Sequence, residues 1–175
     1  MLTMHPFYDQ PTPFGDAGPS IEEGLSPILE RLTCLDDHQR RDAVMRVMAM
    51  AVPPIRVLII DHLVSLLKSR SAAKRRSAEA SLCEMKEWGL PWLRSAILSM
   101  RHSIVQVRLA AILGRIGRTV SPALQWDIHL ALGITMARTK DAKVVAAVLL
   151  AMEQIRPGSA AVEVALRSVA DGAAG

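Results

Sequence analysis

The chain has 175 residues, of which 50% are hydrophobic but only 3% aromatic, so its apolar mass is aliphatic side chains and Met. Sheet-rich domains use aromatic and β-branched residues heavily, and this composition therefore favours an all-α fold. The net charge of +4 is uneven: residues 1–50 hold 8 acids and 4 bases, and residues 51–175 hold 9 acids and 17 bases. A basic body favours an acidic protein surface, nucleic acid or lipid headgroups as a partner.

The sequence has no feature of a secreted or membrane protein. The N-terminus, MLTMHPFYDQ, lacks the basic and apolar regions of a signal peptide, and no apolar run approaches the roughly 18 residues of a membrane span. Cys34 and Cys83 have no CxxC spacing, which indicates free thiols in a reducing compartment. We therefore expect a cytoplasmic protein with no membrane partner.

Residues 1–19 contain four of the ten prolines and show no helical period, which predicts a disordered tail. This tail holds the only Tyr, Tyr8, and both Phe residues, Phe7 and Phe14. Two interpretations stay open for these aromatic residues. Segments of this kind dock into a groove of their own chain or of a partner, but a floppy extension can also carry them incidentally.

Helical periodicity begins at Ser20, where SIEE forms a capping box and predicts an N-terminal capping helix within residues 20–36. From there, apolar residues recur every three or four positions and no segment alternates with period two, so no sheet is expected. The expected helices cover about 21–34, 38–51, 54–69, 72–87, 91–100, 104–116, 122–136, 142–155 and 160–170.

Residues with cap and turn preferences mark the expected helix ends. Asp37 and Asp141 are predicted N-caps. Three prolines are expected in first turns, where the missing N–H costs nothing: Pro54, Pro91 and Pro122. Three glycines are expected just past helix ends: Gly89, Gly117 and Gly158.

Four segments between residues 37 and 175 repeat one pattern: a helix with small residues in its middle, a turn with Pro or Gly, and a second apolar helix. They begin at Arg40, Lys74, Val107 and Val144. The equivalent position near the start of each segment is Arg41, Arg76, Arg108 and Val145, and successive equivalents are 35, 32 and 37 residues apart. A drifting period in the thirties with two helices per unit is typical of an α-solenoid.

Residues 107–117, VRLAAILGRIG, resemble the first helix of a HEAT repeat, of the bacterial type also found in phycobilin lyases. The resemblance implies a short right-handed α-solenoid of about four HEAT-like helical hairpins over residues 37–175. In such an array Ala110, Ala111 and Gly114 let neighbouring helices approach closely. A tetratricopeptide array is the nearest rival, but the three Trp residues do not recur at the single period it would use.

No catalytic motif stands out. The chain lacks a phosphate-binding loop, a GxSxG elbow and an HExxH helix, and no two His residues fall at helical i, i+3 or i+4 spacing. Asp61 with His62, and Asp127 with His129, allow an acid–base pair, but a solvated polar face is the simpler interpretation. The protein is therefore expected not to be an enzyme, and to need no metal or cofactor.

Basic residues give the sharper pattern. No Asp or Glu occurs from Trp88 to Trp126, and a second basic cluster, KSRSAAKRR, covers 68–76. The expected basic patch is Arg70, Lys74, Arg75, Arg76, Arg101, Arg108, Arg115 and Arg118. Three interpretations compete: a solvated edge with ion pairs between repeats, a docking surface for an acidic protein, and a nucleic-acid site.

Polar positions on the second helix of each unit would line the concave side of a solenoid and are the predicted partner-binding residues. They are Asp61, Lys68, Arg94, Gln125, His129 and Arg167. The preferred function is a non-enzymatic scaffold or adaptor that binds another protein with an acidic surface. The alternatives are a nucleic-acid-binding HEAT-like protein, base repair included, and, by resemblance alone, an accessory subunit of a chromophore or cofactor lyase.

Overall fold

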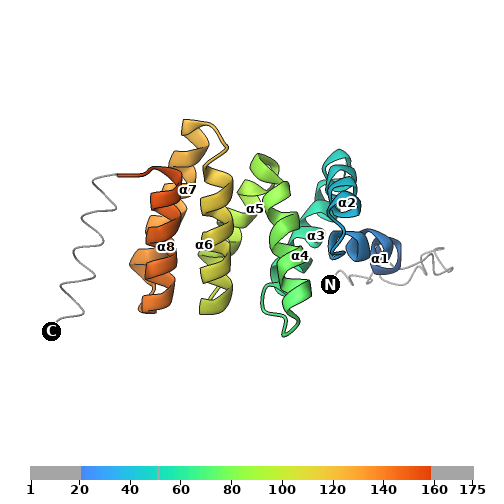
Figure 1. Ribbon diagram of the computed structural model, residues 1–175, viewed down its shortest axis with the longest axis horizontal. Coiled ribbons are helices and arrows are strands. Elements are labelled where there is room, and N and C mark those ends of the chain that lie inside the picture. Colours follow the sequence, from blue (N-terminus) through green and yellow to red (C-terminus); the bar gives the residue numbers. More distant parts are fainter. Residues whose placement is uncertain (1–20, 51, 159–175) are drawn as a thin grey trace, which may run out of the picture.

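The computed structural model describes residues 21–50 and 52–158, and this part of the chain forms eight α-helices and no strand (Figure 1), as the composition predicts. The helices are α1 (Ile21–Leu32), α2 (Asp37–Ala49), α3 (Pro53–Leu66), α4 (Ala72–Glu84), α5 (Lys86–Ser99), α6 (Ser103–Gly117), α7 (Pro122–Arg138) and α8 (Ala142–Ile155). The predicted tail, 1–19, and the predicted helix at 160–170 lie outside the described residues. Over the described ranges, no helix has the length and apolarity needed to cross a bilayer.

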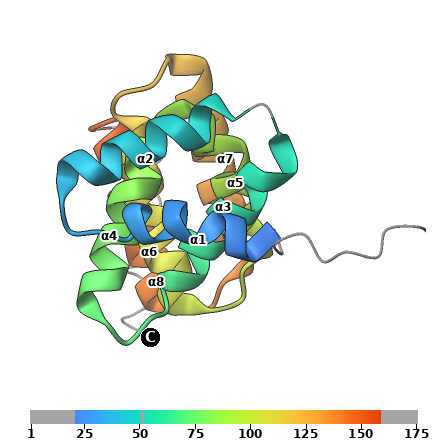
Figure 2. The same ribbon diagram turned by 90° about the vertical axis from the view of Figure 1, so that its right-hand side faces the viewer.

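From α2 onward, the helices alternate between two layers. The even-numbered helices α4, α6 and α8 lie next to one another, and α3, α5 and α7 lie behind them (Figure 1). From α3 onward each helix packs against the next helix in sequence, and from α2 onward each packs against the helix two places further along. Fully buried leucines from both layers, such as Leu63, Leu93 and Leu109, join in one apolar core. The helix α1 crosses one end of the stack (Figure 2) and packs against α2 and α4.

The closest helix pair is α6 and α8, and small residues make it possible. A Cβ atom built on Gly114 would lie 2.9 Å from the Cα of Ala151, and Ala110 is fully buried beside it. Gly114 therefore acts as the predicted point of close approach. Gly117, predicted to follow the helix, is the last residue of α6 instead, and Ile155 fills the space that a side chain there would need.

The prediction that Gly89 and Pro91 mark a helix boundary is wrong. The helix α4 ends at Glu84 and α5 begins at Lys86, which has a left-handed φ of 47°. Gly89 is buried inside α5, where a Cβ would lie 3.1 Å from the Cβ of Met85. Pro91 is also inside α5, on its exposed side. The chain therefore turns this corner at a lysine, a residue with no turn preference.

Most other helix ends lie where the sequence places them. Asp141 caps α8 by accepting the Lys143 N–H at 2.8 Å, and Pro54 and Pro122 occupy first turns. Gly158 follows α8 with a φ of 68°. The N-cap of α2 is Asp36 and not Asp37, since the Asp36 carboxylate accepts the N–H groups of residues 38 and 39 at 2.9 Å each.

Candidate binding surface

The α3–α5 groove is an open depression of about 440 Å³ between two helices of the odd-numbered layer. Its floor is apolar, and its rim carries Asp61, Lys68 and His102. Trp92 stands in the groove half-buried, with its ring packed against the core. The full lining is Val57, Asp61, Val64, Ser65, Lys68, Trp92, Ser95, Ala96, Ser99, Met100, His102 and Val105.

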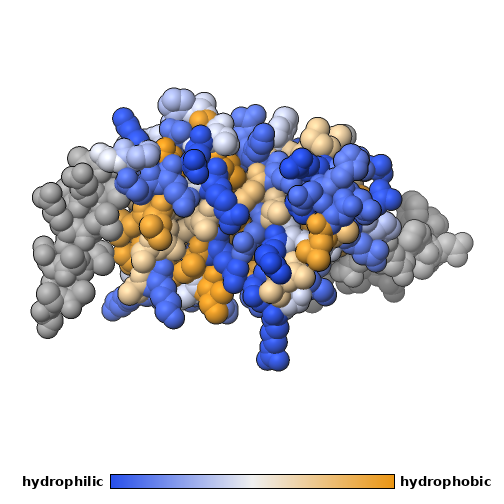
Figure 3. Space-filling model, in the orientation of Figure 1, coloured by the Kyte–Doolittle hydropathy of each residue, from blue (hydrophilic) through white to orange (hydrophobic). Residues whose placement is uncertain are grey.

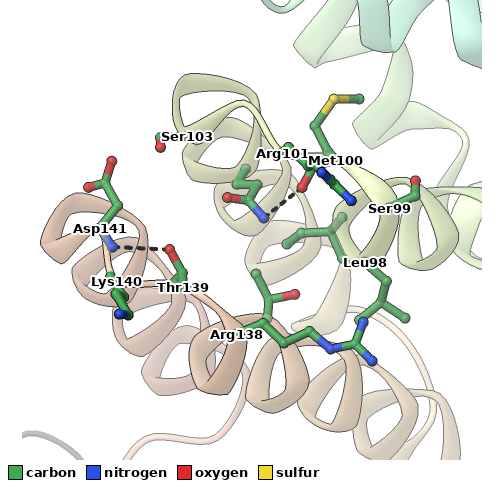
Figure 4. Close-up of a pocket in the computed structure, with 12 residues that line it drawn as sticks. Leu98, Ser99, Met100, Arg101, Ser103, Arg138, Thr139, Lys140 and Asp141 are labelled. Carbon is green, nitrogen blue, oxygen red and sulfur yellow. Dashed lines mark hydrogen bonds between the residues drawn. The ribbon is translucent and has the colours of Figure 1, made fainter.

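A second depression, the α5–α7 pocket, lies on the other side of the end of α5 and has a volume of about 670 Å³ (Figure 4). Three cations, Arg101, Arg138 and Lys140, line it together with one acid, Asp141. Its remaining lining residues are Ile97, Leu98, Ser99, Met100, Ser103, Gln106, Thr135 and Thr139. Because Ser99 and Met100 border both depressions, groove and pocket form one surface around the C-terminal end of α5.

Short turns hold this surface in place. The Gln106 amide donates to the Met100 carbonyl at 2.9 Å, and the Asp141 N–H donates to the Thr139 hydroxyl at 3.2 Å (Figure 4). A hydrogen bond from the Ser103 hydroxyl, followed by one from a backbone N–H, lowers the pKa of Asp141. This carboxylate therefore stays ionised while it caps the start of α8.

Three of the predicted arginines are in ion pairs between neighbouring units. Arg108 donates to one carboxylate oxygen of Glu79, and Arg115 lies 3.5 Å from the other. Arg94 donates to Asp127 at 2.8 Å. The acid-free stretch thus finds its acids on α4 and α7, as the interpretation with inter-repeat ion pairs expects.

Arg40 is a buried charge that the sequence patterns did not predict. Its side chain lies between Asp37, at 2.6 Å, and Glu84, at 3.1 Å. Burial opposes its charge, but the hydrogen bonds that it donates to these two carboxylates raise its pKa overall. The place of Arg40 in the sequence could have indicated its burial, because it precedes the buried Ala43 and Val44 by three and four residues and shares their helix face.

The rest of the predicted basic patch is divided between the two ends of the helices. Arg75 is used internally, since it donates to the carbonyls of Ser69 and Arg70 at 2.7 and 2.8 Å. The other members are exposed and make no ion pair within the described residues: Arg70, Lys74, Arg76, Arg101 and Arg118. Arg101 precedes α6 and Arg118 follows it, so roughly 22 Å of helix separates them.

Only part of the predicted partner-binding set comes together. Asp61 and Lys68 lie in the α3–α5 groove, where both are exposed. Gln125 donates to the Gly117 carbonyl at 3.0 Å, and a ring nitrogen of His129 lies 2.9 Å from the Gln125 carbonyl, so both make contacts within the fold. Arg94 is in the ion pair described above, and Arg167 lies outside the described residues.

The opposite face, formed by α4, α6 and α8, has a different character. Hydropathy colouring shows mostly hydrophilic side chains over α4 and a hydrophobic area over α6 and α8 (Figure 3). Ile104 and Leu150 are 57% and 65% exposed there, and Ile104 borders a depression of about 480 Å³ between α4, α6 and α8. This face therefore combines the Glu79 ion pairs between α4 and α6 with exposed apolar side chains on α6 and α8.

Two further observations concern groups that could bind metal or act as nucleophiles in the described residues. They contain no group of three His, Cys, Asp or Glu side chains that could hold a metal ion. Burial raises the pKa of the Cys83 thiol, which keeps it protonated and poorly nucleophilic. Comparisons of the chain with protein-family models, curated proteins and solved structures found no match.

Proposed function

We propose that this chain is a non-enzymatic protein-binding module, a short HEAT-like α-solenoid that holds its partner against α3, α5 and α7. Two kinds of packing support the solenoid, because such repeats contact only their neighbours: α4 on α5 and α6 on α7 within a hairpin, and each helix from α2 onward on the equivalent helix of the next unit. The small residues that bring α6 against α8 support the resemblance to HEAT repeats. In such an array the second helices form the concave, ligand-binding side.

The observation that carries the proposal is the α3–α5 groove. It combines an apolar floor and an aromatic anchor, Trp92, with a polar rim at Asp61 and Lys68. Protein interfaces use this arrangement, in which a desolvated centre supplies affinity and a charged rim supplies specificity. The neighbouring pocket adds Arg101 and Arg138, which favours a partner with acidic side chains.

Nucleic acid is the second candidate ligand, because Arg101, Arg138 and Lys140 surround one pocket. The structure also weakens this candidate. Arg108 and Arg115, on which a phosphate-binding helix face would depend, already pair with Glu79. The apolar floor of the α3–α5 groove suits side chains better than a sugar–phosphate backbone.

A photo-crosslinking amino acid at Ser95 would test the function, with the same residue at Ala146 as the control. Both positions are exposed, but Ser95 borders the groove and Ala146 lies on α8 in the other layer. We expect one protein to be crosslinked from Ser95 and not from Ala146, and to be retained after nuclease treatment. Products from Ser95 that disappear with nuclease would replace the protein partner with nucleic acid.

A further inference from the structure

The residues that precede α1 have a composition that matches the groove and the pocket. Residues 1–20 contain two acids, Asp9 and Asp16, and no Lys or Arg, whereas Glu22, Glu23 and Glu30 belong to α1. Asp9 and Asp16 each follow a phenylalanine at the same spacing, in Phe7-Tyr8-Asp9 and Phe14-Gly15-Asp16. The segment therefore presents two units, each with an aromatic ring and a carboxylate, seven residues apart.

The described surface offers two receptors of complementary chemistry. The α3–α5 groove combines Trp92 and an apolar floor with one cation, Lys68, and one acid, Asp61. The α5–α7 pocket combines Met100 and Leu98 with three cations and a single acid, so the positive charge is in excess there. Aromatic rings pack well against Trp and against the soft thioether of Met. Packed helices are about 8–10 Å apart, whereas seven extended residues span up to roughly 23 Å, so the two units can reach both depressions at once.

The segment that precedes α1 is also long enough to reach both depressions. Figure 2 shows that the first turn of α1 lies towards the side on which α3 begins, away from α4. Nineteen residues extend up to roughly 60 Å, well beyond the dimensions of a helical domain of this size. A tether of this length gives a millimolar effective concentration, so even weak docking within the chain would be populated.

We propose that residues 1–19 occupy the α3–α5 groove and the α5–α7 pocket as an internal ligand, which an external acidic and aromatic partner must displace. The inference rests on the proposed function, because both ligands use one surface. Phe7 and Phe14 supply the rings, and Asp9 and Asp16 face the cations. A partner with the same chemistry then competes with residues 1–19 for one surface.

The test compares isotope-labelled full chain with a chain lacking residues 1–19, and titrates the second with a synthetic peptide of residues 1–19. Shift differences should concentrate at the Trp92 indole and at Ser95 and Ser99, and the peptide should reproduce them. Reversing one groove cation and one pocket cation, Lys68→Glu with Arg101→Glu, should weaken peptide binding about fivefold or more.

A matched control carries the same charge change on the opposite edge, Lys86→Glu with Arg156→Glu, both exposed, and should bind like the parent. Superimposable spectra of the two chains, or equal weakening by both charge reversals, would overturn the proposal. Differences that grow with protein concentration would overturn docking within one chain. Crosslinking from Ser95 in the shortened chain separates the two ideas, since a partner captured there would leave the proposed function intact.

Discussion

The contact between α6 and α8 gives the most direct test of the repeat packing, through Gly114→Ala. A Cβ at this position would lie 2.9 Å from the Cα of Ala151 and 2.7 Å from the Gln154 amide oxygen. The Gln154 side chain can move away, but the Ala151 backbone moves only if α8 shifts as a whole. Gly133→Ala in α7 is the matched control, since its nearest neighbour is the Met152 methyl at 3.8 Å.

The two substitutions should have opposite effects on the free energy of unfolding. Ala is a better helix former than Gly by about 0.8–1 kcal/mol, and both sites gain this term. Overpacking a filled interface costs about 1–3 kcal/mol, and only Gly114→Ala incurs that cost. We therefore expect Gly114→Ala to destabilise the chain by about 1 kcal/mol and Gly133→Ala to stabilise it by a little under 1 kcal/mol.

Urea and thermal unfolding followed by circular dichroism would measure both. For a chain of this size, 1 kcal/mol corresponds to a change in Tm of about 2–4 °C, so the two variants should differ by roughly 4–8 °C. If Gly114→Ala equals or exceeds the parent in stability while Gly133→Ala shows its gain, the backbones of α6 and α8 are not in contact at this residue. The argument from close approach would then fail.

Three further outcomes follow from the charges and the thiol. Glu79→Gln leaves two arginines without their shared acid and should lower the free energy of unfolding in urea by about 1 kcal/mol. The control, Asp42→Asn, breaks an exposed ion pair on α2 and should lower it by under about 0.5 kcal/mol. Hydrogen bonds lower the pKa values of Asp36 and Asp141 in the folded chain. The stabilisation that these two carboxylates give is therefore fully present above the pKa of an unfolded aspartate, about 3.9, and is lost as pH falls below it. A chain with both residues changed to Asn should lose stability less steeply as the solution is acidified. Burial raises the pKa of Cys83, so the native thiol should react with iodoacetamide at pH 8 far more slowly than in urea, and equal rates would contradict its burial.

The positions of the helices were predictable from the sequence because they depend on local chemistry. Periodicity, the cap at Asp141 and two of the three first-turn prolines, Pro54 and Pro122, act within a few residues and lie where they were expected, whereas Pro91 does not. The small residues of 107–117 likewise predicted a close helix contact. The corner at Lys86 escaped prediction because packing of α5 on the core imposes its left-handed backbone, and no residue preference signals it.

The surface depended on tertiary structure. Whether an arginine is free or paired is decided by acids far away in sequence: 29 residues separate Arg108 from Glu79 and 33 separate Arg94 from Asp127. The proximity of Asp61 and Lys68 was predictable, since seven residues make about two helical turns, although α3 ends at Leu66 and Lys68 lies in the turn that follows. The position of Trp92 in the lining of the groove was not predictable, because a side chain lines a groove only where two helices leave a gap. Periodicity specifies which face of a helix is apolar, but the packing distance between helices decides where that face stays open to a ligand.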